Sequence, residues 1–114
     1  MNYDLEERTI KFAEIILDLS KKVPQNPLTV PIITQLIKAG TSIGANYAEA
    51  NGASSKKDFK NKIFICKKEA RETKYWLRLL SRAVPELKGE CAICFREAQE
   101  ITLIFSKIAQ STKV

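Results

Sequence analysis

The feature that most constrains this sequence is an apolar heptad running through its second half. Alternating steps of four and three residues keep side chains on one face of an α-helix, whereas a strand would need a period of two. The pattern therefore predicts one long helix over residues 55–84, ended by Pro85. At 1.5 Å per residue its length would be about 45 Å. The positions in this seam are Phe59, Ile63, Cys66, Ala70, Thr73, Leu77, Leu80 and Val84.

Three further segments show helical spacing of apolar and small residues, and Pro or Gly residues separate them. They predict helices over residues 4–22, 29–51 and 86–111. Four patterned helices joined by short loops favour antiparallel neighbours. We therefore expect a single all-α domain over residues 1–114, folded as an up-down-up-down four-helix bundle.

Helix ends and close contacts also leave signals in the sequence. Thr29 is a candidate N-cap for the second helix, and Ser55 followed by Asp58 resembles a capping box for the third. Gly40 and Gly44 lie inside the second helix, where each costs about 1 kcal/mol relative to Ala. Such a cost suggests that another backbone approaches closely at these glycines.

Cysteine usage argues against a disulfide framework or a metal site. The three cysteines are an odd number, and the chain contains no histidine. A structural zinc site needs four ligands, usually Cys and His. Cys66, Cys91 and Cys94 all fall in apolar helical seams. We expect them to be buried as small apolar residues, with no metal bound.

Composition excludes several classes of protein. No run of 18 apolar residues predicts a membrane-spanning helix, and the acidic N-terminus does not resemble a signal peptide. A cytoplasmic location without membrane association is therefore expected. No histidine, glycine-rich phosphate loop or nucleophile elbow is present. These absences predict a binding protein, not an enzyme, with no cofactor.

The basic charge of the chain is concentrated in the long helix. Residues 54–83 carry ten basic and three acidic side chains, a net charge of +7, while the whole chain carries +6. On a helical wheel most of these cations share one flank, which predicts a phosphate-binding stripe about 30–40 Å long. A solvated face that only maintains solubility is the alternative, and Tyr75, on the same side, could stack on a base. The candidate nucleic-acid-binding residues are Lys57, Lys60, Lys67, Lys68, Arg71, Lys74, Arg78 and Arg82.

The opposite flank of the same helix carries a second apolar strip. A strip outside the seam suggests contact with another subunit, although a broad core face on a central helix would give the same pattern. A homo-oligomer is the expectation drawn from it. The candidate interface residues are Ile65, Glu69, Glu72, Trp76 and Leu79.

Three polar residues share a face of the second helix with small neighbours. Ser42, Asn46 and Glu49 are separated by four and three residues. Polar groups among small residues near a packed surface usually supply structural hydrogen bonds. A catalytic carboxylate is the alternative, but no partner base is evident.

Two motifs carry a resemblance to a known family. They are QLIKAGTSIGANYAEA over residues 35–50, followed by SSKKDF over 54–59, and KKEARETKYWLRLL over 67–80. Together they resemble the bacterial four-helix-bundle proteins encoded in intervening sequences of 23S rRNA genes. The matching positions are Asn46, Glu49, Glu69, Arg71, Tyr75 and Trp76, to which the family assigns no catalytic role. Tyr47 departs from the pattern, since a smaller aliphatic residue is commoner there, and this puts local packing in question.

The resemblance implies an antiparallel bundle that assembles into a homopentamer around a central channel. It also implies kinship with the accessory proteins of diversity-generating retroelements, which have a basic surface and bind nucleic acid and a reverse transcriptase. We therefore expect an oligomeric protein that associates with nucleic acid, first of all RNA, through the basic flank. The alternative is a scaffold that holds a partner protein and has no nucleic-acid role.

Overall fold

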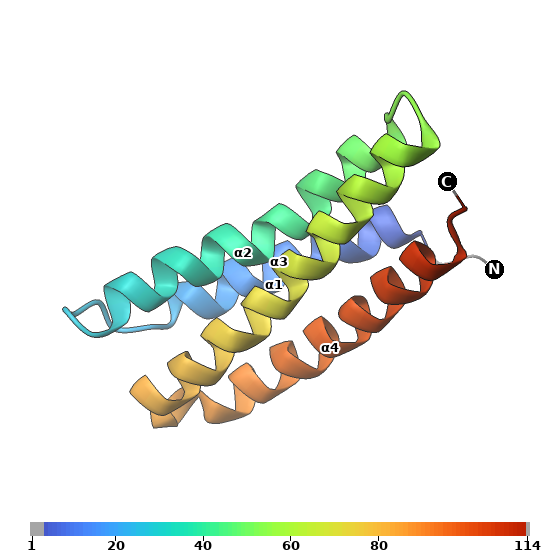
Figure 1. Cartoon of the computed structure of the whole chain (residues 1–114). Coiled ribbons are helices and arrows are strands. Elements are labelled where there is room, and N and C mark those ends of the chain that lie inside the picture. Colours follow the sequence, from blue (N-terminus) through green and yellow to red (C-terminus); the bar gives the residue numbers. More distant parts are fainter. Residues whose placement is uncertain (1–3, 114) are drawn as a thin grey trace.

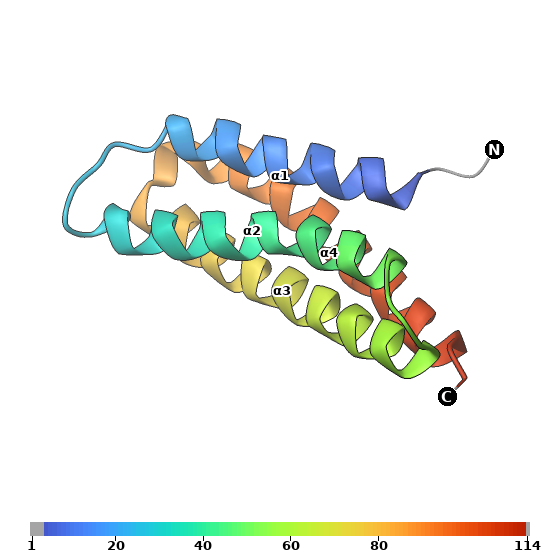
Figure 2. The same ribbon diagram turned by 90° about the horizontal axis from the view of Figure 1, so that it is seen from above.

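The computed structural model describes residues 4–113, which form four α-helices and one short 3-10 turn, with no strand among them (Figure 1). Consecutive helices run in opposite directions, as expected of an up-down-up-down bundle (Figure 2). The molecule is elongated, 45 × 29 × 19 Å. The elements are α1 (Leu5–Lys21), α2 (Thr29–Asn51), α3 (Lys56–Ala83), η1 (Pro85–Leu87) and α4 (Lys88–Ser111).

The helix ends follow local chemistry, with two corrections to the sequence predictions. The Ser55 hydroxyl accepts a hydrogen bond from the Asp58 N–H at 3.0 Å, so the predicted cap of α3 is present. At α2 the predicted cap was wrong. The Asn26 side chain, not Thr29, accepts from the backbone N–H groups of residues 28 and 29. The chain after Pro85 first forms the η1 turn, so α4 begins at Lys88, two residues later than predicted.

The apolar seam of α3 lies along the centre of the bundle. Its positions from Ile63 to Val84 are buried, and Phe59 at its start is half-buried. Phe12 of α1 and Phe105 of α4 are 1% and 0% exposed and occupy the same core. The heptad over residues 59–84 therefore marks the face that the fold removes from water, which is the main source of its stability.

Tyr47 is accommodated within this packing. Its ring is half-buried and meets the ring of Phe105 edge-on, with centroids 5.5 Å apart. Edge-to-face aromatic pairs are favourable beyond the apolar area that they bury. The larger residue at position 47 thus makes a specific contact between α2 and α4.

Gly40 and Gly44 allow α1 to lie close against α2. A Cβ atom added to Gly40 would lie 3.0 Å from both Cγ atoms of Ile16, and one added to Gly44 would lie 3.0 Å from the Thr9 hydroxyl oxygen. Ordinary carbon contacts are about 3.5–4.0 Å. The close approach predicted from the two glycines is confirmed, and the neighbours are side chains of α1.

One charged cluster joins α1 to α4. The Arg8 guanidinium donates to both carboxylate oxygens of Glu97, at 2.7 and 2.8 Å, and to Glu100 at 2.8 Å. Bidentate pairs of this kind are among the stronger surface interactions. They raise the pKa of Arg8 further above its usual value. The cluster ties together the first and last helices of the bundle.

The three cysteines lie in the core, as predicted. Each is at most 3% exposed, and the Cys66 thiol points to the Ile43 carbonyl at 3.5 Å. Burial raises the pKa of Cys66 to about 12 and that of Cys91 to about 11. Thiols held in the neutral form are poor nucleophiles. Among residues 4–113, no cluster of His, Cys, Asp or Glu has the geometry of a metal site.

None of the four helices in the described part of the chain combines the length and apolar character needed to cross a membrane.

Candidate nucleic-acid interface

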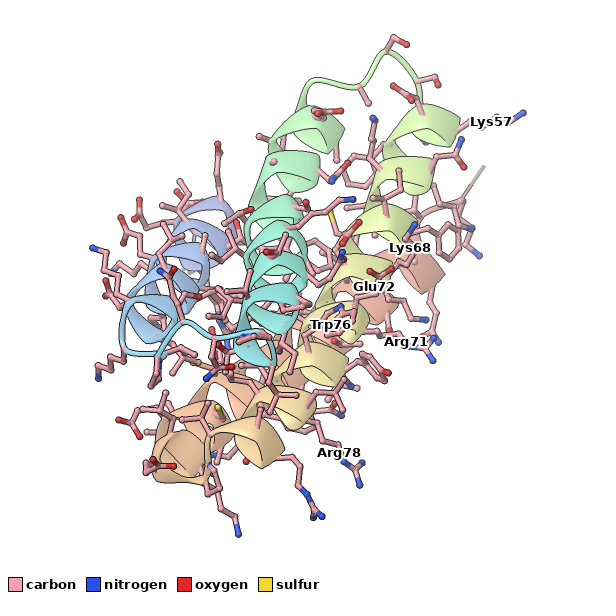
Figure 3. The ribbon with its side chains drawn as sticks, turned by 90° about the vertical axis from the view of Figure 1, so that its left-hand side faces the viewer. Lys57, Lys68, Arg71, Glu72, Trp76 and Arg78 are labelled. Atoms are coloured by element: carbon pink, nitrogen blue, oxygen red, sulfur yellow. The ribbon has the colours of Figure 1, made fainter. Side chains whose placement is uncertain are left out.

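The interface candidate is the outer face of α3, which is one unbroken helix of 28 residues. Figure 3 shows Lys57, Arg71 and Arg78 pointing away from the bundle on the side of α3 remote from α2. Lys57, Lys68, Arg71, Arg78 and Arg82 are exposed. Lys60, Lys67 and Lys74 are half-buried. We call these eight residues the basic face.

Acidic neighbours do not neutralise the basic face. The ion pairs that the structure shows within residues 4–113 involve Arg8, Lys22 and Lys62, and none involves the eight cations. Lys62 lies on the other side of α3 and pairs with Glu49 at 2.7 Å. Lys74 instead donates to the neutral side chain of Gln99 on α4. The face therefore keeps its positive charge, and nearby like charges repel each other unless an anion or solvent screens them.

The basic face extends onto α4, which the sequence analysis did not predict. A surface hollow of about 370 Å³ lies between α3 and α4, and Arg78, Lys88, Phe95 and Arg96 are among its lining residues. The Lys74 ammonium lies 5.9 Å from the centre of the Phe95 ring, within cation–π range. Lys88 and Arg96 are separated by eight residues, and the helical period alone could have placed them on a common side of α4.

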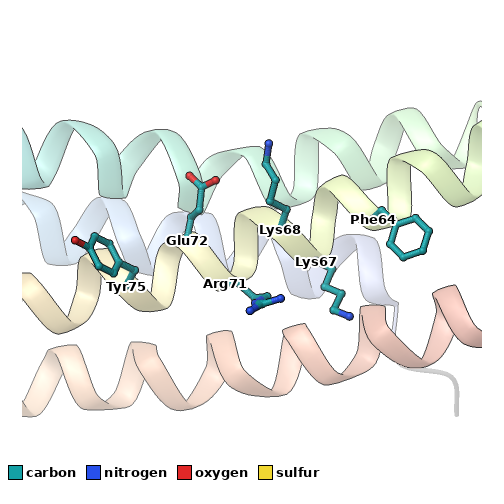
Figure 4. A pocket seen from close by; sticks show the side chains of 6 residues that line it. All are labelled: Phe64, Lys67, Lys68, Arg71, Glu72 and Tyr75. Carbon is teal, nitrogen blue, oxygen red and sulfur yellow. The ribbon is translucent and has the colours of Figure 1, made fainter.

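A second hollow, of about 470 Å³, lies over the middle of α3. Figure 4 shows Lys67 and Arg71 on its α4 side, Lys68 and Glu72 on its α2 side, and the Phe64 and Tyr75 rings at its two ends. Glu72 is the acidic group among these six residues. Sequence reasoning noted Tyr75 but passed over Phe64, because a lone aromatic residue among lysines gave no signal without its neighbours in space.

The candidate oligomer strip lies on the side of α3 that faces α2. Ile65, Trp76 and Leu79 are half-buried within a single chain, and Trp76 packs against the core (Figure 3). Part of the strip is therefore a broad core face, which was the alternative interpretation. Glu72 is exposed, and Glu69 is half-buried. Burial, and then the Glu72 carboxylate, raise the pKa of Glu69.

The polar residues of α2 have ordinary structural partners. The Ser42 hydroxyl donates to the Lys38 carbonyl, and the Asn46 amide donates to the Ser42 carbonyl at 2.9 Å, both within α2. Glu49 reaches across to α3 and accepts from Lys62 at 2.7 Å. The three side chains therefore do not converge on a common site.

Comparison with known proteins agrees with the fold and the motifs. The sequence matches the family of 23S rRNA-intervening sequence proteins over residues 1–106. A solved structure of a protein of unknown function from the S23 ribosomal protein family of Bacteroides thetaiotaomicron VPI-5482 is 32% identical. It superposes with a TM-score of 0.82, over 95% of this chain and 100% of that one. No curated protein matches. On these grounds, the chain belongs to the 23S rRNA-intervening sequence protein family.

Proposed function

We propose that this protein is a non-enzymatic, oligomeric nucleic-acid-binding protein, and that the basic face of α3 contacts the phosphates of RNA. The observation that carries the proposal is the set of eight unpaired cations along one side of an unbroken helix. From Lys57 to Arg82 the stripe covers about 37 Å of helix. A polyanion with regularly spaced charges can contact such a stripe along its whole length.

RNA is the first polyanion to test because the family description refers to 23S rRNA. Each phosphate that a lysine or arginine neutralises releases condensed counterions, and this release drives binding without regard to sequence. The hollow between α3 and α4 adds Lys88 and Arg96 to the same positive surface. Binding of this kind requires no catalytic group.

Self-association is the second part of the proposal. The half-buried Ile65, Trp76 and Leu79 keep some apolar surface in contact with solvent. Side chains on other helices are also exposed, among them Leu103 of α4 at 58%. Covering such surface would stabilise an oligomer. Repeating the basic face in each subunit would raise the effective concentration of binding sites on one RNA molecule. Light scattering gives the subunit count, and a monomer at all working concentrations would remove this part.

The proposed contact predicts a steep dependence of RNA affinity on salt. If three to five cations of one chain contact phosphates, a plot of log affinity against log salt should have a slope of about −2 to −4. Fluorescence anisotropy with labelled RNA between 50 and 300 mM KCl measures it. A slope near zero, or no binding at the lowest salt, would contradict the proposal.

The competing function is a scaffold that binds a partner protein. The observation that favours it is an apolar hollow of about 410 Å³ lined by residues of α1, α2 and the loop between them, among them Leu17, Val30, Ile33 and Ile37. A scaffold would bring down one defined protein and would bind RNA weakly at every salt concentration. Purification of the tagged protein with and without nuclease treatment separates the two functions.

A further inference from the structure

We propose that the basic face takes a single-stranded nucleic acid, with Phe64 and Tyr75 as stacking platforms for two of its bases. The inference rests on the proposed function, which it makes more specific. The phosphates of a duplex and of a single strand are both attracted to cations, so charge alone does not distinguish them. Exposed aromatic rings do, because the bases of a duplex already stack on one another inside the helix.

The two rings lie on one line along α3. They are separated by 11 residues, which is three turns at 3.67 residues per turn, so both project in nearly the same direction. The rise between them is about 16 Å. The Phe64 and Tyr75 side chains are 48% and 58% exposed. Single exposed apolar residues are common on proteins, but here two aromatic rings lie at opposite ends of one charged hollow (Figure 4).

Cations surround both rings. The Lys60 ammonium lies 6.0 Å from the centre of the Phe64 ring. Lys67, Lys68 and Arg71 line the hollow between the two aromatic side chains. An aromatic ring beside a cation is the arrangement that proteins use to hold a base and its phosphate together. A stacked strand that advances about 3.4 Å per nucleotide would extend from one ring to the other in about five nucleotides.

The hollow is asymmetric, and this fixes the expected path of the strand. Lys67 and Arg71 lie on the α4 side of the hollow, whereas Glu72 lies on the α2 side beside Lys68 (Figure 4). A phosphate next to Glu72 would be repelled, while one toward α4 would meet Lys67 and Arg71, with Arg78 and Arg96 farther along. The sugar-phosphate chain should therefore run over the α3–α4 side, with its bases turned onto Phe64 and Tyr75.

The test compares a fluorescently labelled 12-nucleotide single-stranded RNA with a blunt RNA duplex of the same length. The Phe64→Leu/Tyr75→Leu double variant keeps apolar side chains but removes both rings. It should lose at least about tenfold in single-strand affinity, because each base–aromatic stack contributes roughly five- to a hundredfold. Duplex affinity should change less than twofold. Tyr75→Phe keeps a ring and should bind as the parent protein does, and Leu103→Ala, an equally exposed apolar change on α4, should have no effect.

The outcomes separate the two levels of the argument. If the parent protein binds both RNAs with a steep salt dependence and the double leucine variant does the same, stacking is wrong and the phosphate contact stands. If the parent protein binds neither RNA at 50 mM salt, the proposed function itself fails. Both substitutions are at exposed sites, so thermal unfolding should be unchanged, and circular dichroism verifies that a loss of binding is not a loss of fold.

Discussion

Reversing the charges of Lys67, Arg71, Lys74 and Arg78 to Glu is expected to lower RNA affinity by about a thousandfold or more. The change removes four cations and introduces four anions on the side of α3 that faces solvent and α4. Contacts with several phosphates change affinity by several orders of magnitude when they are lost. Repulsion by the new carboxylates adds to the loss. Anisotropy titrations at 100 mM KCl measure the effect directly.

Stability should change little in this variant. Arg71 and Arg78 are exposed, and none of the four side chains takes part in an ion pair shown by the structure. The original like charges at i,i+4 and i,i+3 repel one another by a few tenths of a kcal/mol each, and the reversed charges do the same. The thermal midpoint should therefore stay within a few degrees of the parent value.

A matched control reverses four lysines outside the basic face. Lys11, Lys21, Lys107 and Lys113 are exposed on α1, on α4 and just after α4. Their reversal to Glu makes the same change in net charge and should cost far less affinity. Equal losses in the two variants would mean that overall charge, not the α3 surface, attracts RNA. Unchanged binding in the first variant would exclude the basic face as the site.

The second large effect is expected from adding one methyl group, in Gly40→Ala. Alanine favours a helix over glycine by about 1 kcal/mol. Here, however, the new Cβ would lie 3.0 Å from both Cγ atoms of Ile16, which is fully buried. A β-branched side chain has little rotamer freedom to move aside. Overpacking of this kind costs about 1–3 kcal/mol, so we expect net destabilisation of about 1–2 kcal/mol. Urea denaturation measures it.

Gly89→Ala is the matched control, because no atom lies within 4 Å of the added Cβ. The same substitution there should be neutral or stabilising by up to about 1 kcal/mol, since alanine loses less chain entropy on folding. Ile16→Ala opens space beside Gly40, so the double variant should be more stable than the sum of the two single effects. A stabilising Gly40→Ala would show that α1 can move away from α2 at no cost.

The sequence was enough to find the helices, because their signal is local. Spacing of three and four residues places Ile63, Cys66 and Ala70 on one face whatever the rest of the chain does. Pro85 and Asn51-Gly52 then mark helix ends through their own backbone chemistry. The same local logic misplaced the α2 cap. Asn26 and Thr29 are both good capping residues, and the loop decides which side chain reaches the free N–H groups.

The candidate site divides in the same way. The eight cations of the basic face share a flank of α3 by helical period alone, and the sequence placed them there. Whether acidic groups neutralise them depends on the neighbouring helices, and the structure shows that Glu97 and Glu100 pair with Arg8 instead. The strip around Trp76 shows the reverse case, since a wheel drawn on one helix cannot tell a broad core face from an exposed one.

The sequence by itself determined the four helices, their inward faces and the concentration of positive charge on α3, because each is set by residues within a few turns of one another. Only the tertiary structure decided that Phe64 and Tyr75 border one charged hollow and that Lys88, Phe95 and Arg96 of α4 extend the same surface. It also showed that Trp76 is partly covered by its own chain. These are contacts and exposures set by how helices pack, and packing depends on side chains far apart in the sequence, which no local period encodes.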